Sequence, residues 1–290
     1  MGKKSSGKKK KQNLRKAKSV AALETASSRN HCLDSLRGLA IVLMIVDHIA
    51  GILYGQNIGE SWIRFATRLS MPLFCVVTGY FVGSRFLALA SAETKKNAQS
   101  SRAPIQQVAY WQTVPWNRLG HVALAAAVLN YAYYQIYGQL EILCSLLVCY
   151  LLMYGLRSFF VIALLGFLFF QVESQQVVSP SHGSRLLFDY PVSVVASCVA
   201  VGFVAGRWGA KLAILPALMI PVVARQSSGD NMIVTSPSIY VLYFLVPAVV
   251  LLEASRQFPQ CKIPLLAWIG RYPLRIYVAQ YLIILLFAPS

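Results

Sequence analysis

Residues 32–55 read CLDSLRGLAIVLMIVDHIAGILYG, an apolar run long enough to cross a bilayer as a helix. Four charged or titratable side chains interrupt it: Asp34, Arg37, Asp47 and His48. A charged side chain in a bilayer costs at least about 2.5 kcal/mol on insertion scales, so such groups usually face a bundle interior or a wet cavity and mark function. This helix is therefore where we expect the chemistry.

The composition excludes a soluble globular protein, because 57% of the residues are hydrophobic and only 13% are charged. Further apolar segments follow the first one along the whole chain. We predict an all-α, polytopic transmembrane helix bundle of about nine helices, with eight to ten also compatible because two segments are short for a span. The segments are expected near residues 34–55, 65–90, 118–137, 140–156, 158–172, 190–206, 211–224, 237–254 and 264–287.

The net charge of +17 is concentrated at the start of the chain, where nine of the 27 Lys and Arg residues precede position 19. We predict that residues 1–30 form a disordered, polybasic cytoplasmic tail that binds anionic membrane lipids, and that residues 31–290 form the bundle. The basic run has no interleaved aromatic residues and adjoins a transmembrane segment, so nucleic acid is not expected as a partner. The first apolar run is too long for a cleavable signal and is expected to stay as an anchor.

Basic residues in the loops predict the orientation. With a cytoplasmic tail, nine spans place on the cytoplasmic side Lys95, Lys96, Arg102, Arg118, Arg157, Arg207, Lys211, Arg256 and Lys262. We therefore predict a multi-pass protein with a cytoplasmic N-terminus, in the bacterial inner (plasma) membrane by default. The six cysteines show no CxxC or His-rich spacing, so no metal is expected.

The polar residues of the first segment form a line. Arg37 and His48 are eleven residues apart, close to three helical turns, so they project from nearly the same face about 16 Å apart. Asp34 falls on that face, whereas Asp47 projects about 100° away from His48. A histidine in a semi-dry cavity is a natural general base. The alternative is structural, since polar side chains often bridge neighbouring helices in bundles.

Three other arginines are candidate anion contacts. Arg68 begins the second segment and would pair with Asp47 or clamp a phosphate or carboxylate, unless it only reaches toward the interface. Arg271 and Arg275 are one turn apart on one helix face, where they would form an anion site or simply obey the positive-inside rule.

The run LDSLRGLAIVLMIVDH, residues 33–48, resembles the first transmembrane helix of the membrane-bound acyltransferase superfamily, which includes acyltransferase family 3, the TraX pilin-acetylating proteins and the heparan glucosaminide N-acetyltransferases. The family 3 signature, an Arg, ten residues and a His, is matched by Arg37 and His48. RLSMPLFCVVTGYF, residues 68–81, looks most like TraX. The closing WIGRYPLRIYVAQYLI is similar to the final helix of the superfamily, although Gln280 stands where many members have His.

The resemblance implies a bundle that transfers an acyl group, expected to be acetyl, from cytoplasmic acetyl-CoA to a hydroxyl or amine of a glycan, lipid or peptide. By position, His48 would be the catalytic base or transient acyl carrier, and Asp47 would support it. The implied donor-binding residues are Arg37, Arg68, Arg271 and Arg275.

Two other classes of function stay open. Asp47 and His48 would also suit a proton relay in a proton-coupled transporter or lipid-handling protein, although no repeat with paired broken helices is evident. In a scaffold or assembly subunit, the same polar residues would only hold helices together. The acceptor and the oligomeric state do not follow from the sequence.

Overall fold

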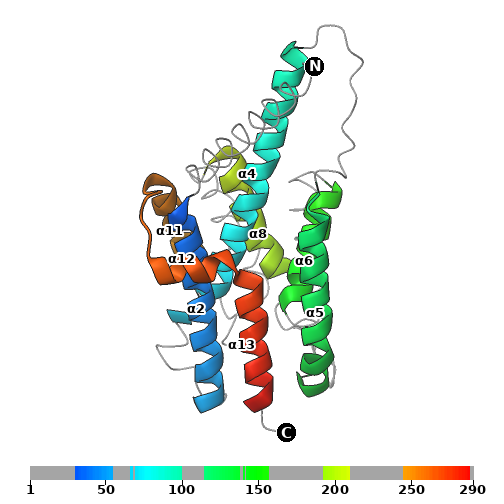
Figure 1. Ribbon diagram of the computed structural model, residues 1–290, viewed down its shortest axis with the longest axis vertical. Helices are drawn as coiled ribbons and strands as arrows, with labels where there is room; N and C mark the ends of the chain where they lie inside the picture. The colour runs from blue at the N-terminus through cyan, green and yellow to red at the C-terminus, as the bar shows by residue number, and fades with distance from the viewer. Residues whose placement is uncertain are drawn as a thin grey trace, which may run out of the picture.

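The computed structural model describes residues 30–54, 66–67, 69–99, 114–137, 140, 142–156, 192–209 and 244–287. In these ranges the elements are eight helices with short non-helical stretches beside them and no extended strand, which confirms the all-α prediction for this part (Figure 1). The helices are α2 (His31–Tyr54), α4 (Ser70–Gln99), α5 (Trp116–Tyr137), α6 (Ile142–Leu156), α8 (Val192–Trp208), α11 (Val246–Gln257), α12 (Pro264–Arg271) and α13 (Pro273–Phe287).

Most predicted segments correspond to helices. The segments near 34–55, 118–137, 140–156 and 190–206 correspond to α2, α5, α6 and α8. The segment near 65–90 overlaps α4, which continues to Gln99, and the segment near 237–254 overlaps α11. The segments near 158–172 and 211–224, and the basic tail up to residue 29, lie outside the described residues.

One prediction about the helices is wrong. The last apolar segment, 264–287, is two helices rather than one, with Tyr272 between them. Tyr272 leaves the helical conformation at φ −120° and ψ 47°. The cause is Pro273, because proline lacks an amide hydrogen and disfavours helical backbone at the residue before it. Figure 1 shows α12 lying across the direction of α2 and α13.

One helix among the described residues is long and apolar enough to cross a membrane, in the window Ser70–Leu87 of α4, with a mean hydropathy of 1.2. Three shorter apolar stretches are Ile142–Tyr154, Val195–Trp208 and Pro273–Ile284. α2 differs from this window by carrying three charged side chains, Asp34, Arg37 and Asp47. The prediction of a helical bundle is therefore confirmed in its coarse form, as packed helices.

Glycines bring α4 and α8 into backbone contact. Gly79 and Gly83 on α4 face Gly202 and Gly206 on α8, with a spacing of four residues on each helix. A Cβ at Gly79 would overlap the carbonyl oxygen of Val199, so neither helix could approach the other as closely with larger residues. Paired small residues at this spacing are typical of close helix contacts in membranes.

A second glycine contact joins α2 to α12. A Cβ at Gly38 would overlap the carbonyl oxygen of Leu266, and one at Gly270 would overlap that of Asp34. Asn30 caps α2 by accepting a hydrogen bond from the backbone of Leu33 at 3.0 Å, and its amide donates to the carbonyl of Ser255 on α11 at 3.1 Å. The first turns of α2 are thus fixed against α11 and α12.

Candidate functional site

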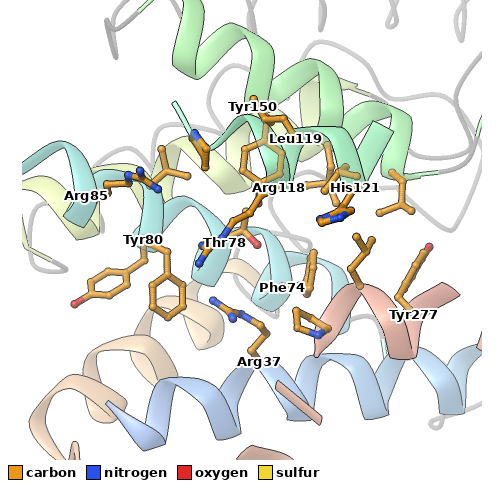
Figure 2. A pocket seen from close by; sticks show the side chains of 18 of the residues that line it. Arg37, Phe74, Thr78, Tyr80, Arg85, Arg118, Leu119, His121, Tyr150 and Tyr277 are labelled. Atoms are coloured by element: carbon orange, nitrogen blue, oxygen red, sulfur yellow. The ribbon is translucent and has the colours of Figure 1, made fainter. Parts of the chain in front are cut away.

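A cavity of about 900 Å³ lies among α2, α4, α5, α6, α12 and the start of α13 (Figure 2). Four arginines and one histidine line it, together with a single carboxylate among the described lining residues. These side chains are Asp34, Arg37, Arg85, Arg118, His121 and Arg271. The walls between them are apolar and aromatic, with Phe74, Phe81 and Tyr150 among them. The cavity is therefore strongly electropositive and suits an anionic ligand with an apolar part.

Arg37 is fixed in the cavity wall by contacts with two other helices. Its Nη1 donates a hydrogen bond to the carbonyl oxygen of Gly270 at 3.3 Å, and its guanidinium carbon lies 4.3 Å from the centroid of the Phe81 ring. The planar group is thereby oriented before any ligand arrives. Figure 2 shows Arg37 rising from α2 toward the cavity, with Arg118 and His121 on the opposite side.

His48 is placed differently from Arg37. It is not among the residues that line the cavity, and its ring lies edge to face against Tyr281 of α13, with centroids 5.0 Å apart and planes at 74°. Met44 and Tyr277, each one helical turn earlier on its helix, do line the cavity. The His48–Tyr281 pair therefore lies one turn beyond the cavity wall. Of the three polar residues predicted to share one face of α2, Asp34 and Arg37 line the cavity, and His48 lies beyond its wall.

Asp47 has a partner outside the cavity. Its carboxylate accepts a hydrogen bond of 2.7 Å from the hydroxyl of Thr67, which is 2% exposed. The predicted pairing of Asp47 with Arg68 is untested, because Arg68 lies outside the described residues. The hydrogen bond ties α2 to the residues that precede α4.

The two arginines near the last helix are separated by the break in that helix. Arg271, at the end of α12, lines the cavity beside Arg37. Arg275 is exposed, is absent from the lining residues, and lies over the ring of Tyr272 at 5.7 Å. The structure therefore brings Arg271 to the cavity but places Arg275 outside it.

Three further residues of the cavity lie outside the site that the sequence predicts: Arg85, Arg118 and His121. Two signals point toward them. Arg118 and His121 are three residues apart, so they share one face of α5, and Arg85 interrupts the apolar run of α4. These residues come from two helices, α4 and α5, and it is the packing of these helices that brings them to one cavity, which a local sequence pattern does not show.

The part of the chain that matches a known protein family contains two helices of the site, α2 and α4. Residues 30–102 match the family model of the acyltransferase domain of acyltransferase family 3. The match spans α2 and α4, and so includes Asp34, Arg37, His48 and Arg85. It confirms the resemblance to acyltransferase family 3 over about a quarter of the chain and supports an acyltransferase-type function, in a family that is typically associated with membranes. No curated protein and no solved structure matches the chain.

Proposed function

We propose that the protein is an integral-membrane, multi-pass acyltransferase that moves an acyl group, acetyl first among the candidates, from acyl-CoA to a hydroxyl or amine of a glycan, lipid or peptide. The observation that carries the proposal is the arginine-lined cavity formed in part by the helices of the family match. The nucleotide of CoA carries a phosphate and a diphosphate. Guanidinium groups bind such groups through paired, charge-assisted hydrogen bonds.

In this proposal the donor nucleotide occupies the cavity and contacts Arg37, Arg271, Arg85 and Arg118. The predicted cytoplasmic side is the side of the α2 N-terminus, where the capping residue Asn30 also lines the cavity. The cavity would then take its donor from the cytoplasm. Arg68 stays a predicted donor contact.

The reacting end of the donor would reach His48. Its imidazole removes the proton of the acceptor hydroxyl or amine as the acceptor oxygen or nitrogen attacks the thioester carbonyl carbon. The new C–O or C–N bond forms, the C–S bond breaks, and the leaving CoA thiolate takes the proton from the imidazolium. In the two-step variant, the imidazole nitrogen attacks the thioester, the C–S bond breaks and CoA thiolate leaves; the acceptor then attacks the acyl-imidazole, the C–N bond to the imidazole breaks, and the acceptor proton goes to the thiolate. The Thr67 hydrogen bond of Asp47 would hold this part of α2 in place.

The test compares acyl transfer with donor binding. Membranes that contain the wild type or His48→Ala are supplied with labelled acetyl-CoA, and CoA affinity is measured on the purified proteins. Because His48 lies beyond the cavity wall, we expect the variant to lose transfer to the acceptor and to keep wild-type CoA affinity. Equal labelling by both proteins would exclude the role given to His48. Solute transport driven by a pH gradient in proteoliposomes without acetyl-CoA would favour the relay alternative.

A further inference from the structure

Gln280 of α13 is a buried amide that is not paired within the described structure. Its side chain is 7% exposed, and both Oε1 and Nε2 are buried without a hydrogen-bond partner among the described residues. Burying an amide without partners destabilises a fold, and an apolar residue of the same size would avoid that cost. A polar group kept in this state points to a ligand that pairs with it.

Gln280 lies on α13 between a residue that lines the cavity and a residue that contacts His48. It follows Tyr277, which lines the arginine cavity, by three residues, and it precedes Tyr281, which contacts His48. The two tyrosine rings lie 5.1 Å apart. Gln280 thus stands on α13 one turn beyond the cavity wall, at the level of His48. A donor held by its phosphates in the cavity has to pass this level to bring its thioester to the imidazole.

The part of acyl-CoA between the nucleotide and the thioester is the pantetheine arm, which carries two amide groups. We infer that Gln280 binds this arm, with Nε2 donating to a carbonyl oxygen of the arm and Oε1 accepting from one of its N–H groups. The inference rests on the proposed function and adds a specificity residue to it. A carboxamide does not titrate near neutral pH, so this position supplies binding and no proton transfer.

The experiment separates the arm from the nucleotide. Wild type and Gln280→Met, which keeps the side-chain length without the amide, are titrated with CoA and with 3′-phosphoadenosine 5′-diphosphate, the nucleotide of CoA without its arm. We expect the CoA Kd of the variant to rise by about tenfold, as the loss of one or two hydrogen bonds predicts. The nucleotide Kd should be unchanged. The Tm of the unliganded variant should equal or exceed that of the wild type.

Asn130 provides a matched control, because it is a buried amide of similar exposure, 8%, whose amide nitrogen is paired within the protein. Its Nδ2 donates to the carbonyl of Ala126 at 2.7 Å and contacts Cys144 Sγ at 3.0 Å. Asn130→Leu should lower the Tm and leave both Kd values at the wild-type level.

Three results would overturn the inference. Gln280→Met could bind CoA as tightly as the wild type, or its unliganded Tm could fall by several degrees, as expected if the amide already had a protein partner. Either result would leave the proposed function standing as long as the wild type binds CoA. A wild type that binds neither CoA nor the nucleotide would overturn the proposed function and this inference together.

Discussion

At the scale of single residues, Arg37 makes contacts that lysine cannot reproduce. Its flat guanidinium lies over Phe81 and at the same time donates to the carbonyl of Gly270. An ammonium group keeps the charge but has neither the plane nor the fork of donors. We expect Arg37→Lys to lower kcat/KM for acetyl-CoA by about 10- to 100-fold, mainly through KM, because the positioning of the donor phosphates is lost.

Initial rates at varied acetyl-CoA concentration would measure this effect. The matched control is Arg207→Lys, since Arg207 lies over the ring of Trp208 at 5.2 Å and is absent from the cavity lining. Its KM should match that of the wild type. If Arg37→Lys also kept a wild-type KM, the donor would not bind at Arg37.

Arg271 and Arg275 allow the structure to be tested against the sequence pattern. The pattern places both on one helix face, whereas the break before Pro273 leaves only Arg271 in the cavity wall. We expect Arg271→Gln to weaken CoA binding by about tenfold, and Arg275→Gln to have an effect several times smaller, since Arg275 lies outside the cavity and water and salt screen its charge from a ligand bound there. Titration calorimetry on both variants would decide. An equal loss of CoA affinity in both variants would instead favour the prediction from the sequence, in which both arginines bind the anion from one helix face.

The site could be predicted in part from the sequence. Asp34 and Arg37 were predictable because a charged group inside a membrane-length apolar helix has few stable places other than a polar cavity. Arg85, Arg118 and His121 were not, because their role depends on how α4 and α5 pack against α2. Asp47 and Thr67 show the same limit, since their hydrogen bond joins residues twenty positions apart.

At the scale of helices, the glycines of α4 and α8 control the packing that forms one wall of the cavity. A Cβ at Gly202 would overlap the carbonyl oxygen of Val76, which is backbone and cannot turn aside. We expect Gly202→Ala to destabilise the protein by about 1–3 kcal/mol, as overpacking in a tight core does. Gly120 of α5 has nothing within 4 Å of the equivalent Cβ position.

Gly120→Ala therefore tests helix propensity without crowding, and it should be neutral or stabilising by up to about 1 kcal/mol. Thermal unfolding of both purified variants gives the comparison. A Gly202→Ala variant as stable as Gly120→Ala would mean that α4 and α8 are not in backbone contact.

The helices themselves were more predictable than their ends. Long apolar runs predicted α2, α4, α5, α6 and α8, because an apolar run of this length favours a helix over a strand. The segment 264–287 extends across the division between α12 and α13 because apolar residues resume directly after Pro273, whereas the proline itself ends the first helix. That break turns α12 across α2, so it is also what separates Arg271 from Arg275.

At the scale of the whole molecule, orientation in the membrane decides which substrates reach each end of the site. The predicted orientation puts the N-terminus of α2, and with it the arginine cavity, on the cytoplasmic side. The end of α11 and the connection to α12 pack against the same end of α2, since the amide of Asn30 donates to the carbonyl of Ser255 on α11 and the hydroxyl of Ser35 accepts from the backbone of Ile263 in the connection at 3.2 Å. A reporter in this connection therefore reports the side of the cavity.

Cys261 is such a reporter, because it is exposed in that connection, whereas Cys75, Cys149 and Cys198 are buried. A membrane-impermeant maleimide should label Cys261 in inverted vesicles and leave it unlabelled in intact cells, because thiol modification requires access to solvent. Cys261→Ser should remove most of the labelling in inverted vesicles and thereby identify the site. Labelling of Cys261 in intact cells would place the cavity on the outer face of the membrane, away from cytoplasmic acyl-CoA. The proposed donor would then have no route to Arg37, and the proposed direction of acyl transfer would have to be abandoned.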